Sequence, residues 1–363
     1  MNKPAKAIAK KLFSLFARLN YCAELIPRAK AKDLACLVII SFLFILTACT
    51  NKDDASPYDE ILAQPLYASL TDSIKQQPKN DELYFRRAVL LNKNNFPEPA
   101  LADFQKAWSL HKYEKYAFGI ANIWLDKKPD SAAIFLNEAL KGLPESYLLR
   151  LSLARAYDAL NKTGEALKVC NQLAGMQPAR PEVLLLQSEL LDKKGDSLGS
   201  IAPMEKAYSL SPASLEVGLK LAYKYAESKN EKVIPLCDSL IRKDSLHLHA
   251  DPFYVKGVYY SNINDKEKAI QWFDETIRYS YNYLNAYIEK GKILVGQKKI
   301  AEALTVFKLA NRISPAFPDA YYWIGVCQEK QGQKDEARLS YEKAYSLDKT
   351  FTEAKDAADK ISK

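Results

Sequence analysis

The sequence predicts an all-helical solenoid, and two observations lead to that fold class. Gly is scarce, with 12 copies in 363 residues. Ala, Leu, Lys and Glu are abundant, and no run of alternating β-branched residues occurs, which is typical of helices. A shift of the chain against itself by 34 residues also superimposes four separate columns of small or aromatic residues. A fixed period of this length indicates stacked helix–turn–helix units.

The four columns are clearest in the last three units. They are Gly257, Gly291 and Gly325; Ala269, Ala303 and Ala337; Phe273, Phe307 and Tyr341; and Phe253, Tyr287 and Tyr321. In each unit an aromatic residue and the glycine four positions later share one face of a first helix. Gly within a helix costs about 1 kcal/mol relative to Ala, so the glycines imply a neighbour that packs too closely for a side chain. The Ala-x3-aromatic pattern marks the packing face of a second helix.

This pattern resembles the tetratricopeptide repeat. The stretch DAYYWIGVCQEKQGQKDEARLSYEKAYSLD matches the family at its aromatic, Ile–Gly, turn Gly and Ala positions, which are Tyr321, Ile324, Gly325, Gly332, Ala337, Tyr341 and Ala344. The resemblance implies an all-α superhelix of about eight helix–turn–helix repeats over residues 81–351. The units are expected at 81–112, 113–146, 147–180, 181–214, 215–249, 250–283, 284–317 and 318–351.

Short segments flank the repeats. Residues 58–80 are expected to form a half repeat or N-terminal cap, and residues 352–363 a C-terminal capping helix, because a solenoid needs polar ends to stay soluble. Pro residues near the ends of several units, Pro178 among them, fit this division because Pro cannot continue a helix. Two units match less well, with the turn DKKPD in 113–146 and Pro235 in 215–249.

The N-terminal segment has the layout of a secretory signal peptide over residues 1–48. Eight Lys and Arg precede an uncharged run from Leu34 to Ala48, which is shorter than the roughly 20 residues of a membrane-spanning helix. The tetrapeptide Leu46-Thr47-Ala48-Cys49 resembles the lipobox of bacterial lipoproteins. The resemblance implies cleavage before Cys49, fatty acylation of Cys49 and a polar tether over residues 49–57; a short signal anchor is the alternative.

By resemblance to Gram-negative sorting rules, Thr50 after the cysteine implies the outer membrane. The cluster Lys52-Asp53-Asp54 looks like a surface-export signal of some lipoproteins, so both the periplasmic face and the cell surface stay open. Without residues 1–48 the net charge falls from +8 to about +2. A nearly neutral chain lacks the basic footprint of nucleic-acid binding.

The remaining thiols are too far apart for a disulfide framework or a zinc site. Cys170, Cys237 and Cys327 lie in amphipathic patterns and are expected to be small buried hydrophobes. His247 and His249 lack evident further ligands, so no metal or cofactor is expected. The letters GDSL at Gly195–Leu198, with Asp244 and His247, match an esterase family. Both segments fall at turns, however, without the strand–turn–helix context of that family.

The resemblance also predicts a binding groove on the inward-facing positions of the first helices. The residues expected to line it are Phe85, Val89, Trp124, Arg155, Tyr223, Tyr254, Val258, Lys292 and Tyr322. Such an apolar, aromatic surface suits an amphipathic helix or an extended peptide held by aromatic anchors. The alternative is that these side chains only pack neighbouring helices. The cationic clamp that some relatives use for a partner's C-terminal carboxylate is absent from these positions.

Together these patterns predict a membrane-anchored scaffold or assembly factor that binds a protein or peptide in the cell envelope and is not an enzyme. Some outer-membrane sugar-binding lipoproteins contain the same repeats, so a glycan-binding lipoprotein is the first alternative. A GDSL-type esterase is the second.

Overall fold

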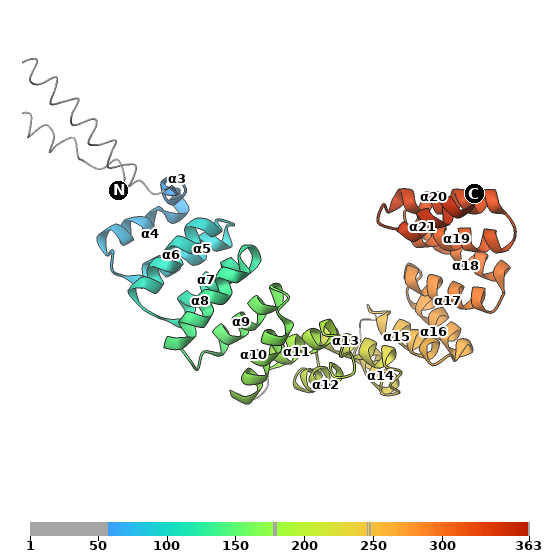
Figure 1. Cartoon of the computed structure of the whole chain (residues 1–363), viewed down its shortest axis with the longest axis horizontal. Coiled ribbons are helices and arrows are strands. Elements are labelled where there is room, and N and C mark those ends of the chain that lie inside the picture. Colours follow the sequence, from blue (N-terminus) through green and yellow to red (C-terminus); the bar gives the residue numbers. More distant parts are fainter. Residues whose placement is uncertain (1–56, 177–179, 245, 247, 362–363) are drawn as a thin grey trace, which may run out of the picture. The chain divides into compact units, whose positions relative to one another are not determined.

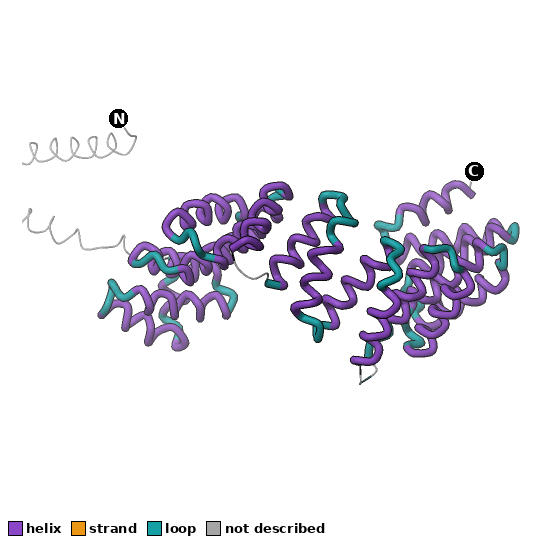
Figure 2. The backbone as a smooth tube through the Cα atoms, turned by 90° about the horizontal axis from the view of Figure 1, so that it is seen from below, coloured by secondary structure: helices purple, strands orange, loops and turns teal. Residues whose placement is uncertain are grey.

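A computed structural model describes residues 57–176, 180–244, 246 and 248–361. Within these residues there are 19 helices and no strand (Figure 2), which confirms the all-helical solenoid predicted from the sequence. The predicted signal peptide, Cys49 and most of the tether lie outside the described residues, as do Pro178 and His247. No helix in the described part is long and apolar enough to cross a membrane.

The chain divides into two compact units, residues 1–75 and 76–363. The described part of the first unit contains α3 (Asp59–Leu62) and most of α4 (Pro65–Gln76). The Thr71 hydroxyl donates to the Leu62 carbonyl at 3.0 Å and so links α4 to the end of α3. The boundary between the units falls inside the segment 58–80 that was expected to form a cap.

The second unit consists of eight antiparallel helix pairs and a final helix (Figure 1). The pairs are α5 (Asp81–Lys93) with α6 (Pro97–Leu110), α7 (Glu114–Lys127) with α8 (Pro129–Gly142), α9 (Tyr147–Ala159) with α10 (Thr163–Met176), α11 (Pro181–Lys193) with α12 (Ile201–Leu210), α13 (Leu215–Glu227) with α14 (Val233–Lys243), α15 (Asp251–Asn262) with α16 (Lys266–Tyr279), α17 (Leu284–Gly296) with α18 (Ile300–Ile313), and α19 (Pro318–Lys330) with α20 (Lys334–Leu347). The last helix is α21 (Thr352–Ile361), which buries Ala354 and Ala358 and packs on α20.

Each pair packs mainly against its neighbours in sequence. The second helix of every pair contacts the first helix of the next pair, and α7–α9, α13–α15 and α17–α19 also contact each other directly. Stability in such a stack comes from each repeat and from the interfaces between neighbours.

The glycine column lies where an aromatic ring of the second helix presses on the first helix. A Cβ atom placed on Gly257 would lie 2.5 Å from Cε1 of Phe273, and one on Gly325 would lie 2.8 Å from Cδ1 of Tyr341. Phe273 is fully buried. The close neighbour that the sequence pattern implied is therefore the aromatic residue of the same repeat.

The turns within the pairs share a left-handed residue. Seven of the eight turns contain one residue with φ between 56° and 85°: Asn95, Asn161, Gly195, Lys229, Asn264, Lys298 and Gly332. Gly and Asn adopt this conformation readily, whereas Lys does so at a cost. In the remaining pair, Lys128 alone separates α7 from α8, and its φ is −144°. Within the DKKPD segment the turn is thus a single residue, and α8 begins at Pro129.

The three described cysteines are buried, as the sequence predicted. Burial raises the pKa of the Cys170 and Cys237 thiols to about 12 and that of Cys327 to about 11. Thiols of this kind stay protonated at neutral pH and behave as small apolar side chains.

Candidate functional site

The candidate surface lies on the first helices of the eight pairs and is called the first-helix layer below. These helices are α5, α7, α9, α11, α13, α15, α17 and α19. The nine groove residues predicted from the sequence all lie on these helices. Three of them are exposed: Val89, with 45% of its surface accessible, Arg155 and Lys292. The Lys292 ammonium pairs with Glu289 at 2.8 Å and lies 5.9 Å from the ring centre of Trp323.

Two of the predicted aromatic residues are half-buried and pack between helices. The Phe85 ring lies 5.9 Å from Phe104 and 5.3 Å from Tyr116, and therefore joins the first pair to α7. The Trp124 ring meets Phe135 edge to face at 5.6 Å. These contacts show that both side chains take part in helix packing, and their role in binding stays a prediction.

The structure brings Tyr223 and Tyr254 together around Tyr283. The Tyr283 hydroxyl donates to Oδ1 of Asp251 at 3.0 Å, and the nearby Tyr223 contributes to raising the pKa of Tyr283. The Tyr254 ring lies 5.0 Å from the Tyr283 ring. Burial raises the pKa of Tyr254 and Tyr283, so both phenols are neutral at physiological pH. Val258 packs in the apolar clusters on either side of α15.

Tyr322 lies in a second aromatic group near the C-terminus. Its ring is 5.0 Å from Phe351, 5.5 Å from Tyr341 and 5.5 Å from Trp323. Tyr322 keeps part of its surface accessible, whereas Tyr341 is buried. The two aromatic groups therefore place partly exposed rings on α13, α15 and α19 and, through Tyr283, at the residue before α17.

Elsewhere in the first-helix layer, side chains at positions expected to face inward are buried. Ala117 and Ala121 are fully buried in the cluster that joins α7 to α9, and Leu151 is 6% exposed in the same cluster. Small side chains at these positions let α9 approach α7 directly. The predicted positions thus form separate accessible patches along the described layer.

Sequence reasoning missed a series of ion pairs between consecutive first helices. An acid in one repeat is paired with a lysine of the next in Glu82–Lys115 (2.5 Å), Asp158–Lys193 (2.5 Å), Glu189–Lys220 (3.6 Å) and Asp192–Lys224. An acid followed by a lysine after about one repeat length is the signal that could have revealed them. Exposed pairs of this kind contribute about 0–1 kcal/mol each, so they mainly set the charge of the surface.

One buried ion pair, and a second in which only the lysine is buried, were also missed. The Arg87 guanidinium makes a bidentate contact with Asp103 at 2.7 and 2.8 Å, and both side chains are buried. The Lys256 side chain is 4% exposed, pairs with Asp238 of the preceding repeat and places its ammonium 3.9 Å from the centre of the Trp272 ring. Both pairs lie between helices and have a structural role.

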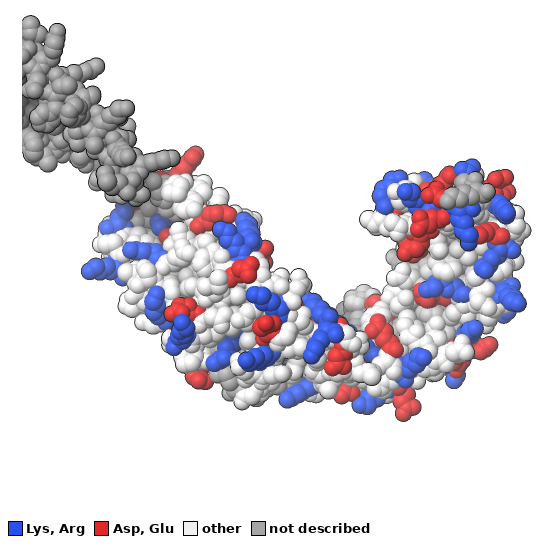
Figure 3. All heavy atoms as spheres, in the orientation of Figure 1, with Lys and Arg blue, Asp and Glu red and all other residues white. Residues whose placement is uncertain are grey.

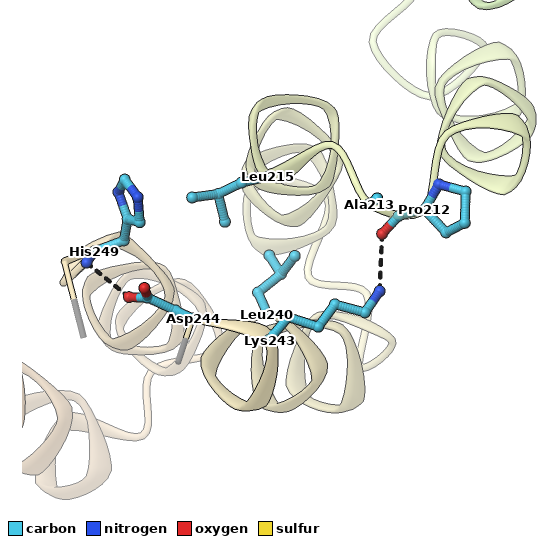
Figure 4. Close-up of a pocket in the computed structure, with 7 residues that line it drawn as sticks. All are labelled: Pro212, Ala213, Leu215, Leu240, Lys243, Asp244 and His249. Atoms are coloured by element: carbon cyan, nitrogen blue, oxygen red, sulfur yellow. Dashed lines mark hydrogen bonds between the residues drawn. The ribbon is translucent and has the colours of Figure 1, made fainter. Parts of the chain in front are cut away.

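A small pocket lies between the α12–α13 turn and the α14–α15 connection (Figure 4). Its volume is about 180 Å³, and its lining consists of Pro212, Ala213, Leu215, Leu240, Lys243, Asp244 and His249. Lys243 Nζ donates to the Pro212 carbonyl at 2.8 Å, and the His249 backbone N–H donates to Asp244 at 2.8 Å. Ligand pockets usually measure about 300–1,000 Å³, so this one is too small for a peptide.

Two residues of the esterase-like motif, Ser197 and Asp244, lie in the described part of the chain, and both make local contacts. Ser197 is exposed in the α11–α12 turn, where its carbonyl accepts a hydrogen bond from the Ser200 hydroxyl at 2.8 Å. Asp244 accepts backbone N–H groups of Leu248 and His249. No group of three metal-ligating side chains occurs in the part of the chain that the structure describes.

The repeated helix pairs are recognised by comparison with known families. Models described as tetratricopeptide repeat match residues 124–190, 250–283 and 318–351, and one described as TPR repeat matches residues 291–332. The chain contains tetratricopeptide repeats. Solenoids of such repeats present extended surfaces that bind other molecules. A search among curated proteins finds no match to the sequence.

Several solved structures are similar to this tetratricopeptide repeat chain. The C-terminal part of a TPR protein from Cytophaga hutchinsonii is 18% identical, with a TM-score of 0.48 over 66% of this chain and 98% of that one. YrrB, described as a TPR protein with an unusual peptide-binding site, is 18% identical, with a TM-score of 0.37 over 60% and 95%. In the Cut9–Hcn1 complex the match is 14% identical, with a TM-score of 0.42, and spans 83% of this chain but 60% of that chain.

Proposed function

We propose that the chain is an interaction scaffold whose first-helix layer binds a protein or peptide. The observation that supports this most strongly is the pair of half-exposed aromatic groups around Tyr254 and Tyr322, which keep neutral rings at the surface of α15 and α19. Aromatic side chains of this kind often supply most of the binding energy at protein interfaces. Catalysis is not part of the proposal.

We further propose that the chain is anchored to a membrane through Cys49. The sequence Leu46–Cys49 supports lipidation, residues 1–48 support export, and residues 49–57 would connect the lipid to the helices. Durable anchoring needs two or more acyl chains, because each buried CH2 contributes only about 0.8 kcal/mol. We place the protein at the outer membrane, on its periplasmic face or at the cell surface, with a partner in the cell envelope.

Metabolic labelling with an alkyne analogue of palmitate tests the anchor. The wild-type chain should carry the label and sediment with membranes, whereas Cys49→Ala should lose the label. Cys36→Ala serves as a control because cleavage before Cys49 would remove Cys36 with the leader. Equal labelling of wild type and Cys49→Ala would refute the lipidation.

Site-specific photocrosslinking in living cells tests the binding surface. A photoreactive phenylalanine analogue at Tyr254 should capture a discrete protein, because this position lies on the first-helix layer. The control position is Ile134, which is on the second helix α8 and 74% exposed. The same protein captured from both positions would contradict the assignment. Retention of the chain on envelope polysaccharide, with no protein captured, would support the glycan-binding alternative.

A further inference from the structure

An open groove lies between the adjacent helices α15 and α16 (Figure 1) and is called the α15–α16 groove below. Its volume is about 750 Å³, which falls within the range of about 300–1,000 Å³ that is usual for ligand pockets. The lining consists of Phe253 and Tyr260 of α15 and of Lys268, Gln271, Trp272, Asp274 and Glu275 of α16. None of these side chains is among the residues predicted to line the peptide-binding groove.

Three aromatic side chains give the α15–α16 groove apolar surfaces. Phe253, Tyr260 and Trp272 are each partly exposed. The Phe253 ring lies 6.3 Å from the Trp272 ring. The buried Lys256, which pairs with Asp238, places its ammonium 3.9 Å from the centre of the same indole. These contacts hold the indole in position before a ligand arrives, so that less conformational entropy is lost on binding.

The charged side chains of the groove are already paired within the chain. Each has a partner of opposite charge, in Lys268–Asp265, Asp274–Lys290 and Glu275–Arg278. On the face that Figure 3 shows, Lys and Arg are interspersed with Asp and Glu around the helices that Figure 1 labels α15 and α16. A charged ligand would have to compete with these pairs, so the groove favours a ligand without net charge.

Two neutral polar groups of the groove have no partner in the described part of the chain. Neither the Gln271 amide nor the Trp272 indole N–H is hydrogen-bonded to a described residue, and neither group is buried. The amide both donates and accepts hydrogen bonds, and the indole N–H donates. The groove therefore combines aromatic surfaces with neutral hydrogen-bonding groups that a ligand can reach.

We propose that the α15–α16 groove binds a neutral oligosaccharide. A pyranose ring presents C–H groups on its faces, and their partial positive charge suits the negative faces of aromatic rings. Its hydroxyl groups donate and accept hydrogen bonds, as the Gln271 amide and the Trp272 indole require. A purely aliphatic ligand would leave these two groups unpaired. This binding activity goes beyond the scaffold function and uses none of the side chains assigned to it.

Isothermal titration calorimetry with defined sugars tests this proposal. The full chain, in a detergent whose head group contains no sugar, is titrated with cellohexaose, maltohexaose, xylohexaose and mannohexaose. At least one of these neutral probes should bind with a Kd of about 1 mM or lower, and hexagalacturonate, an acidic probe, should bind more weakly. Because the charges of the groove are paired within the chain, the affinity for the neutral probe should change less than about twofold between about 50 and about 500 mM salt.

Three single substitutions localise the site. Trp272→Ala should weaken sugar binding about tenfold, because an aromatic contact is lost. Gln271→Ala, at an exposed position, should weaken it about three- to tenfold and covers the case in which Trp272→Ala impairs folding. Lys168→Ala is the matched control and should leave the affinity unchanged. Lys168 lines a second open groove, between α10 and α11, whose volume is about 680 Å³ and whose lining contains no aromatic side chain.

Any one of four results would overturn the inference: no binding of the four neutral sugars, tighter binding of the acidic probe, an affinity that falls steeply with salt, or equal effects of Gln271→Ala and Lys168→Ala. These results leave the scaffold function standing if a protein is still captured from Tyr254 in cells. Failure of that capture would instead refute the scaffold function and leave the sugar binding untouched.

Discussion

Replacing Gly291 by Ala should destabilise the chain, although Ala favours helices. A Cβ atom at this position would lie within 3.0 Å of three atoms of the Phe307 ring, and the ring is fully buried. Overpacking of this kind costs about 1–3 kcal/mol. The gain in helix propensity offsets up to about 1 kcal/mol. Because the enclosed ring cannot turn outward, we expect a net loss of about 1–2 kcal/mol.

The matched control lies in the same helix. Gly296 is the last residue of α17, and a Cβ atom there would meet nothing within 4 Å. Gly296→Ala should therefore be neutral or stabilise the chain by up to about 1 kcal/mol. Urea unfolding followed by circular dichroism compares the two variants. Equal or reversed effects would refute the claim that the glycine column exists to admit the aromatic ring.

Three further predictions concern turns, ionisation and buried charge. Lys298→Gly should stabilise the chain by roughly 0.5–1 kcal/mol, because Lys298 has a φ of 62°; lower stability in a thermal melt would contradict this. Burial, together with the nearby Tyr223 and Asp251, raises the pKa of Tyr283 in the folded chain. The contribution of this pKa shift to folding stability is therefore complete below pH about 10 and is lost as the pH rises further. Tyr283→Phe should flatten the fall in stability at alkaline pH, and an unchanged profile of stability against pH would contradict this role of Tyr283. Arg87→Met should cost about 3–5 kcal/mol by leaving Asp103 buried without its partner, and adding Asp103→Leu should recover most of the loss in urea unfolding.

The repeated packing contacts could be predicted from the sequence because they recur with a fixed period. Gly257 and Phe273 appear at the same spacing in successive repeats, and this spacing required a close contact that the structure confirms. The turns were harder to predict. Lys229 and Lys298 have a positive φ that nothing in a lysine side chain indicates, whereas Gly195 and Gly332 indicate it directly.

The candidate site could be predicted only in part. The aromatic side chains of Tyr254 and Tyr322 are visible as columns in the sequence. Their exposure depends on how closely neighbouring first helices approach, as the burial of Ala117 beside α9 shows. The ion pairs between consecutive first helices depend on contacts between repeats, which a column read one position at a time does not contain.

Hydrogen exchange on the complex with the protein captured from Tyr254 tests the central claim most directly. The account predicts that the bound partner slows exchange in α15, α17 and α19, with little change in the second helices α16, α18 and α20. Protection confined to those second helices would contradict the assignment of the first-helix layer as the binding surface.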